Sequence, residues 1–199
     1  MKAVVAAFIA VAASAYAAAE DVIVEGGRSP DGRYEVHLVR TLNYNPNNDG
    51  SEYLFHIQAA AGNKTLLSLL GSGFRGYTMA KRYCSALWDG SSRVVAITDH
   101  NTRHTTTLHV VTVSTDGTRQ LEIPDYVQNA LGRVNATEVD FACVSRPQRW
   151  DEDDLVVQLY FTANGRHSYT CDVTLRINHE EHSSPSVELK ALTKPEKGE

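Results

Sequence analysis

The densest group of residues able to do chemistry occupies positions 99–104, with the sequence Asp-His-Asn-Thr-Arg-His. Imidazole and carboxylate groups in one loop can exchange a proton or hold a metal, so Asp99, His100, Arg103 and His104 are the candidate ligand-binding residues. The competing interpretation is a polar turn whose Asp and Asn satisfy local backbone groups. We favour the turn, because two histidines four apart on a loop have no fixed geometry.

A second candidate is the acidic run at residues 151–154, Asp-Glu-Asp-Asp. Its hard oxygen ligands suit calcium, and Asp151 and Asp153 are the candidate metal ligands. The run lacks the alternating ligands and the glycine of an EF-hand loop. A solvated acidic turn is therefore the preferred interpretation, and no cofactor is expected.

Nucleophilic catalysis has less support than either of these sites. The sequence has no Gly-x-Ser-x-Gly elbow, and no cysteine has a recognisable activating context. We therefore expect a non-catalytic binding module. The alternative is a secreted hydrolase or metal-dependent enzyme that uses the loop from Asp99 to His104.

The elements that would position these residues are predicted to be β-strands. Runs of four to nine residues alternate apolar with polar and are separated by Gly, Asn and Asp clusters, as at residues 34–39. Ser29-Pro30-Asp31-Gly32 has Pro at the second and Gly at the fourth position of a type I turn. The sequence therefore predicts an all-β fold.

The strands repeat as three units of four, because Asp31, Asp89 and Asp151 each lie between a short strand and a longer aliphatic strand. The first unit is predicted at Asp21–Glu25, Arg33–Thr41, Glu52–Ala60 and Lys64–Leu70. The second is predicted at Lys81–Leu87, Arg93–Asp99, Thr106–Ser114 and Thr118–Ile123. The third is predicted at Glu138–Ser145, Leu155–Thr162, Ser168–Asn178 and Ser186–Leu192. Each unit should be an antiparallel meander.

A repeated four-stranded meander with a Ser-Pro-Asp-Gly-Arg-Tyr turn at residues 29–34 resembles the blades of TolB-type and prolyl-oligopeptidase-type β-propellers. Residues 88–93 match the turn loosely, and the third copy replaces the turn glycine with an acidic stretch. The resemblance implies a propeller-like partial array. Propellers close with four to eight blades, so three units would need to oligomerise or stack openly, and an antiparallel β-sandwich is the alternative fold.

The repeat also suggests roles for the cysteines and tryptophans. Cys84 and Cys143 fall in the first predicted strands of consecutive units, which predicts a Cys84–Cys143 disulfide and leaves Cys171 free. Trp88 and Trp150 occupy equivalent places and are each followed by Asp. Repetition at an equivalent place favours packing between units over ligand recognition.

Outside the strands, three further segments are expected. Residues 1–17 have the charge, apolar run and small-x-small ending of a secretory signal. Residues 124–132 begin with Pro-Asp and end with Gly, which predicts one short helix. Residues 18–192 would form a single β-repeat domain, followed by a polar, disordered tail at 193–199.

Charge narrows the class of partner. Lys and Arg number 19 against 24 Asp and Glu, giving a net charge of −5, which argues against a nucleic-acid binder. No stretch beyond the signal is apolar enough for stable membrane insertion. The sequence therefore predicts a secreted or periplasmic protein whose partner is a protein, a glycan or a small solute.

Overall fold

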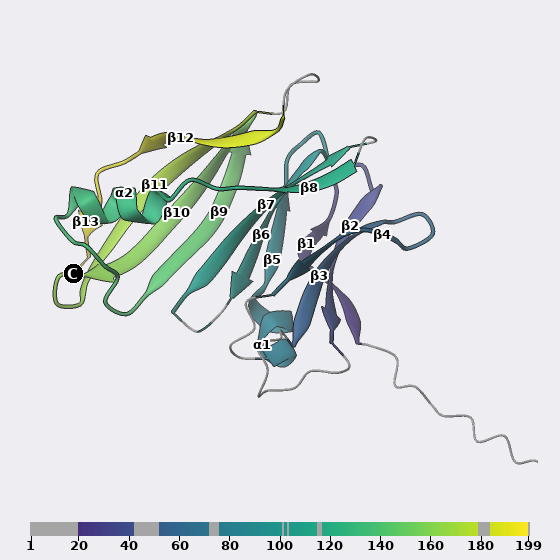
Figure 1. Cartoon of the computed structure of the whole chain (residues 1–199), viewed down its shortest axis with the longest axis horizontal. Helices are drawn as coiled ribbons and strands as arrows, with labels where there is room; N and C mark the ends of the chain where they lie inside the picture. Colours follow the sequence, from purple (N-terminus) through teal and green to yellow (C-terminus); the bar gives the residue numbers. More distant parts are fainter. Residues whose placement is uncertain are drawn as a thin grey trace, which may run out of the picture.

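The computed structural model describes residues 20–41, 52–71, 76–100, 102, 104–114, 117–178 and 184–198. Within these ranges nearly all regular structure is β-strand, which confirms the all-β prediction (Figure 1). The predicted signal segment, residues 1–17, lies outside the described residues.

The strands form three successive antiparallel meanders, as predicted. The first contains β1 (Asp21–Arg28), β2 (Tyr34–Arg40), β3 (Tyr53–Ala59) and β4 (Lys64–Leu70). The second contains β5 (Ser85–Trp88), β6 (Val94–His100), β7 (Thr106–Ser114) and β8 (Gly117–Leu121). The third contains β9 (Cys143–Asp151), β10 (Asp154–Ala163), β11 (His167–Asn178) and β12 (Ser186–Leu192).

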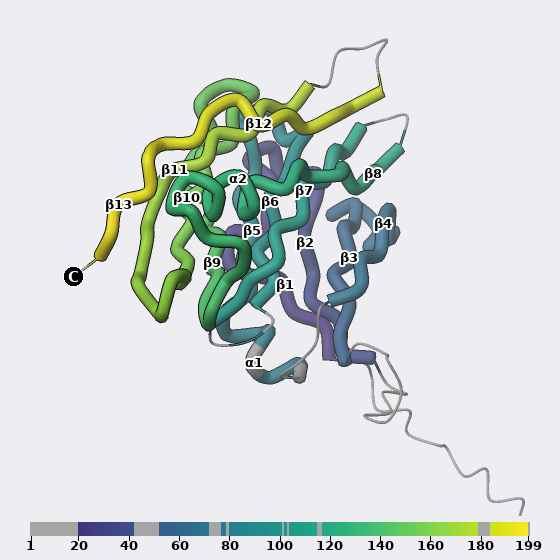
Figure 2. The backbone as a smooth tube through the Cα atoms, turned by 60° about the vertical axis from the view of Figure 1, so that its left-hand side comes forward, coloured from purple at the N-terminus to yellow at the C-terminus, as the bar shows by residue number. Residues whose placement is uncertain are grey.

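The first two units are joined into one eight-stranded sheet, in the order β4-β3-β2-β1-β5-β6-β7-β8. The junction is a parallel pairing of β1 with β5, in which Glu25 lies opposite Ser85. A propeller would instead keep each unit as a sheet of its own. The joined sheet curls until its edge strands β4 and β8 come into contact, as Figures 1 and 2 both show.

The third unit forms a second sheet, in the order β12-β11-β10-β9. In place of the disordered tail expected at residues 193–199, β13 (Glu196–Lys197) pairs with the beginning of β11. The backbone N–H groups of Thr193 and Gly198 also donate to the carbonyls of Asp172 and Ser168. These backbone bonds hold a segment whose side chains are too polar to form a core.

The first strand of the third unit begins later than predicted. Residues 138–142 precede β9, which runs from Cys143 to Asp151. Pro147 falls within it beside a register shift against β10, between Val156 and Val157. Proline has no N–H to donate, and an edge strand with a bulge is where a sheet accepts it.

Two short helices accompany the sheets. The predicted helix is confirmed as α2 (Tyr126–Arg133), and the side chain of Asp125 caps it by accepting from the N–H of Gln128. Residues 81–83, predicted to begin a strand, instead end α1 (Gly76–Tyr83). Tyr77 and Ala80, three positions apart, bury one face of α1 in the core. Neither helix in the described part of the chain has the length and apolarity to cross a bilayer.

The middle unit separates two hydrophobic cores. One core fills the inside of the curled sheet and includes Val95 and Ile97 from β6. The other lies between the second sheet, α2 and the opposite face of β6, which contributes Val94 and Ala96. Strand β6 is therefore buried on both faces, and its apolar run lacks the alternation seen in β2.

The two tryptophans link consecutive units in the same way. The indole N–H of Trp88 donates to the Gly27 carbonyl at 3.0 Å, and that of Trp150 donates to the Leu87 carbonyl at 3.1 Å. The sequence separations are 61 and 63 residues. Trp88 also stacks on Tyr34, with ring centroids 6.1 Å apart. These contacts confirm that both indoles join neighbouring units.

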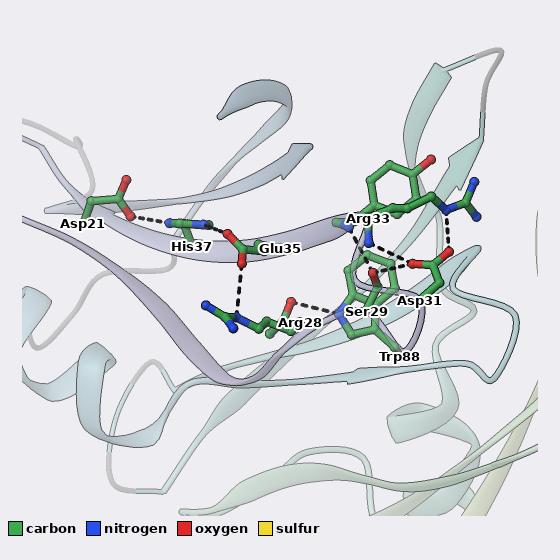
Figure 3. Close-up of polar contacts among 10 residues, drawn as sticks. Asp21, Arg28, Ser29, Asp31, Arg33, Glu35, His37 and Trp88 are labelled. Atoms are coloured by element: carbon green, nitrogen blue, oxygen red, sulfur yellow. Dashed lines mark hydrogen bonds and ion pairs between the residues drawn. The ribbon is translucent and has the colours of Figure 1, made fainter. Parts of the chain in front are cut away.

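The turns preceding β2 and β6 are each held by a carboxylate, which is Asp31 at the third position of the first turn and Asp89 at the first position of the second. Gly32 N–H donates to the carbonyl of Ser29 at 2.9 Å, as a type I turn requires, and Oδ1 of Asp31 accepts from the Ser29 hydroxyl. In the second unit, Asp89 Oδ1 accepts the N–H groups of Arg93 and Val94, both at 2.8 Å. Figure 3 shows the first of these turns beside Trp88.

Candidate functional site

The loop predicted to carry chemistry does not bring its side chains together. Asp99 is fully buried and faces the inside of the curled sheet. Its Oδ1 accepts a 2.6 Å hydrogen bond from the Tyr53 hydroxyl and lies 3.7 Å from Sγ of Cys84. Nε2 of His109 is 3.9 Å from its other oxygen. Asp99 is therefore part of a polar cluster within the first core.

The two histidines of the loop face elsewhere. His100 packs against the ring of Tyr83, with centroids 5.7 Å apart. Burial, followed by the charge of Arg146, lowers the pKa of His100 from its ordinary value. The exposed His104 instead packs its ring on Phe141 at 4.2 Å. Arg103 lies outside the described residues.

His104 lines a surface groove of about 310 Å³ on the second sheet. The other lining residues are Ala142, Val144, Arg146, Gln158, Tyr160 and Thr170. They come from β9, β10, β11 and the segment leading into β9. A groove of this size is within the range of small-molecule sites.

Strand register explains why these side chains meet. Tyr160 lies opposite Val144 on β9 and opposite Thr170 on β11, so the three side chains share one face of the sheet. Gln158 lies opposite Arg146 in the next row on that face. The alternate residues, such as Phe161 and Cys171, point into the second core. The groove is therefore on the side of the sheet turned away from that core.

His104 reaches this face because the chain before β7 runs beside the start of β9. The N–H of Cys143 donates to the carbonyl of His104 at 2.8 Å, and Thr105 bridges Cys143 in parallel. The Thr106 hydroxyl continues the contact by accepting from the N–H of Ser145 at 2.7 Å. A residue of the second unit thereby completes a groove built on the third.

The groove presents polar groups that the fold does not use. The side chains of Arg146, Gln158 and Thr170 make no hydrogen bond or ion pair with any other described residue. The Tyr160 hydroxyl shares a hydrogen bond of 2.9 Å with Ser168. Tyr160, which is 38% exposed, lines the groove, and Phe141, which is 55% exposed, packs on His104 at its edge. Such an arrangement can bind a ligand that has both polar groups and a flat apolar face.

Sequence reasoning found His104 but missed the rest of the groove. Arg146, Gln158, Tyr160 and Thr170 are spread over three strands, and none forms a motif along the chain. The available signal was the alternation within β10, where Gln158 and Tyr160 are polar or amphipathic positions between the buried Val157, Leu159 and Phe161. That signal identifies an outward face but does not show that neighbouring strands match it.

The predicted Cys84–Cys143 disulfide is not formed, and all three cysteines are free. Cys84 belongs to the core inside the curled sheet, whereas Cys143 packs against the other core, so the doubly buried middle unit separates them. Burial raises the pKa of Cys84 to about 12 and that of Cys171 to about 11, and it also raises the pKa of Cys143. These thiols are poor nucleophiles near neutral pH.

The acidic run forms the tight turn between β9 and β10. Asp151 pairs with Arg149 at 3.1 Å, and Asp154 pairs with Arg176 at 2.8 Å. Asp153 contributes its backbone carbonyl to the N–H of Ile177. Within the described ranges, no three His, Cys, Asp or Glu side chains are grouped to hold a metal ion, so Asp151 and Asp153 are not joined by a third such ligand there.

Another polar chain lies on β1 and β2 (Figure 3). The ring nitrogens of His37 lie 2.6 Å from Asp21 and 3.0 Å from Glu35, and Glu35 also pairs with Arg28 at 3.1 Å. Its members are paired with one another across the two strands, and none of them lines the groove on the second sheet. The chain therefore stabilises the pairing of β1 with β2.

Comparisons with known proteins do not assign the chain to a family. No protein-family model matches the sequence, and a search of curated proteins gives no match. Function must therefore be argued from the groove itself.

Proposed function

We propose that this protein is an exported, non-catalytic β-repeat module that binds a carbohydrate ligand in the groove on β9, β10 and β11. The observation that carries the proposal is the combination of unused polar side chains, Arg146, Gln158 and Thr170, with two exposed aromatic rings. A sugar ring has hydroxyl groups for the polar side chains and an apolar face for an aromatic ring. The second sheet would act as a rigid platform that fixes both kinds of contact.

The groove supports binding better than catalysis because the two candidate acid–base residues, Asp99 and His104, face different parts of the molecule. Asp99 faces the first core and His104 lines the groove. Catalysis by this pair would require both groups within hydrogen-bond reach of one substrate. The enzyme alternative predicts that His100→Ala with His104→Ala releases a stoichiometric metal. We expect the double variant to retain the wild-type metal content and to lower the free energy of unfolding by about 1 kcal/mol, because His100 is half-buried against Tyr83.

Export is supported by the pattern of residues 1–17, in which Lys2 precedes an apolar run and Ala15 and Ala17 satisfy the small-residue rule. Intact-mass measurement of material secreted by an expression host should show loss of the chain through about Ala17. A secreted product that retains Met1 would contradict this part of the proposal.

The test of carbohydrate binding compares two exposed tyrosines. Wild-type protein and the Tyr160→Ala and Tyr83→Ala variants would be applied to an array of neutral and acidic oligosaccharides. Tyr160 lines the groove and Tyr83, 42% exposed, does not. We expect Tyr160→Ala to weaken binding of the bound oligosaccharides at least tenfold and Tyr83→Ala to preserve it. Absence of any saccharide binding by the wild type, or equal loss in both variants, would overturn the proposal.

A further inference from the structure

We propose that the saccharide recognised by the groove carries a carboxylate, as a uronic acid does, and that Arg146 binds this group. The inference rests on the proposed function and names its ligand class more closely. Arg146 is the cation that lines the groove, and its guanidinium has no carboxylate partner among the described residues. Arginine binds planar carboxylates through two parallel hydrogen bonds.

The fixed charge of the groove comes from Arg146. His100 lies close enough for the guanidinium to help lower its pKa, which favours the neutral imidazole. No Asp or Glu lines the groove. A protein with a net charge of −5 thus presents, among the unused polar side chains of this groove, a positive group that no carboxylate of the described residues pairs. This local charge complements an anion.

The surrounding carboxylates restrict which anion fits. Asp172 lies opposite Gln158 on the next strand, and Glu196 lies opposite Thr170, both exposed and just outside the lining. They would repel a phosphate that carries nearly two charges. A uronic acid brings one charge, and its hydroxyl groups can donate to carboxylate oxygens. The arrangement therefore favours an acidic sugar over a phosphate.

The aromatic rings fix where the rest of the ligand would lie. Tyr160 is in the row of Val144 and Thr170, one row from Arg146 and Gln158. A ring bound by its carboxylate at Arg146 can thus extend over the exposed face of Tyr160. Gln158, in the row of Arg146 and without an internal partner, can bond the hydroxyl groups of the same sugar.

The experiment uses pairs of ligands that differ only in charge. Calorimetric titrations of the full chain would use trimers of galacturonic acid and glucuronic acid, the fully methyl-esterified form of each trimer, and inorganic phosphate. The variants are Arg146→Gln and, as a matched control on the same strand, Arg149→Gln, whose guanidinium pairs with Asp151 outside the groove. Circular dichroism would confirm that each variant is folded.

We expect at least one acid trimer to bind tenfold or more tightly than its ester. Arg146→Gln should remove this preference while leaving affinity for the ester unchanged, and Arg149→Gln should leave both affinities at wild-type values. Equal binding of acid and ester would overturn the inference but retain carbohydrate binding. Phosphate binding as tight as that of the acid trimer would overturn the choice of an acidic sugar. Failure of every saccharide to bind would overturn the inference and the proposed function together.

Discussion

The indole N–H of Trp88 donates a hydrogen bond to the Gly27 carbonyl, 61 residues earlier in the chain. Trp150 repeats the bond to Leu87, so each unit after the first is fastened to its predecessor by a tryptophan. Figure 3 shows Trp88 reaching across to the first unit. When the indole is removed, a buried carbonyl stays without a donor, whereas water can replace the donor at an exposed one. The free-energy cost of losing each bond therefore depends on how deeply the indole is buried.

Replacing Trp88 with Phe should cost about 1–3 kcal/mol, because a buried carbonyl loses its donor. Trp88 is 7% exposed and Trp150 is only partly buried, so Trp150→Phe should cost less. Urea unfolding monitored by circular dichroism measures both. A larger loss at Trp150 than at Trp88 would contradict the argument from burial.

A second prediction compares two glycines that have similar left-handed backbone conformations, φ +67° at Gly26 and φ +70° at Gly32. A Cβ at Gly26 would lie 2.2 Å from the Ala86 carbonyl oxygen on the paired strand, whereas nothing lies within 4 Å at Gly32. Gly32→Ala should cost about 1–2 kcal/mol from backbone strain alone.

Gly26→Ala should cost distinctly more, because the clash is with backbone beside the parallel pairing of Glu25 with Ser85 that joins β1 to β5. The melting temperatures of the two variants compare the effects directly. Similar losses in both would mean that the parallel junction can shift to admit a methyl group.

The third prediction concerns acid stability at the first turn. The backbone N–H of Arg33 and the hydroxyl of Ser29 donate to Asp31, and the first of these contacts contributes most to lowering its pKa to about 2. A carboxylate whose pKa is depressed in the folded state contributes stability above its unfolded value, near 3.8, and loses it as the pH falls toward 2.

Asp31→Asn removes this ionisation and keeps most of the side-chain shape. The difference in unfolding free energy between wild type and variant should be largest above pH 4 and should shrink between pH 4 and pH 2. Urea titrations at a series of pH values supply the measurement. A difference that stays constant over this range would show that the charge of Asp31 does not matter to the turn.

The fourth prediction tests the polar cluster inside the curled sheet. Tyr53→Phe removes the hydroxyl that donates to the fully buried Asp99 at 2.6 Å, and should cost about 1–3 kcal/mol. Tyr126→Phe is the matched control, since its hydroxyl donates to the small, neutral Ser145 hydroxyl in the other core. The control should cost about 1 kcal/mol. Unfolding of Tyr53→Phe at the wild-type midpoint would contradict a structural role for Asp99.

Strands and turns were predictable because their signals are local. Alternation at residues 34–39 and the turn at Ser29–Gly32 locate β2 and its start with no knowledge of the rest of the chain. Helix α1 was missed for a related reason. The strand predicted at Lys81–Leu87 took in the last residues of α1, and the burial of Tyr77 and Ala80 becomes visible only when the curled sheet is present to receive them.

Neither the parallel pairing that joins the first two units into one sheet nor the groove was predictable, because both depend on contacts between residues far apart in the sequence. Nothing near Glu25 or Ser85 in the sequence indicates that they pair in parallel. The groove likewise needs Arg146, Gln158 and Thr170 to fall in matching rows, which the register between strands decides. The loop from Asp99 to His104 looked like a site because its residues are sequence neighbours, but successive side chains of an extended chain face opposite ways.

The position of β6 between two cores has a consequence for how the repeats can diverge. A unit at the end of the array keeps one solvent face, where polar substitutions are cheap, as the exposed Gln158 and Tyr160 of β10 illustrate. The middle unit has no such face along Val94–Asp99, so a charge introduced at any of these positions would be buried in one core or the other. Units of identical sequence could not fit both the middle of the array, where both faces are buried, and its ends, where one face meets solvent. The weak resemblance among the three units is therefore what their different places in the array demand.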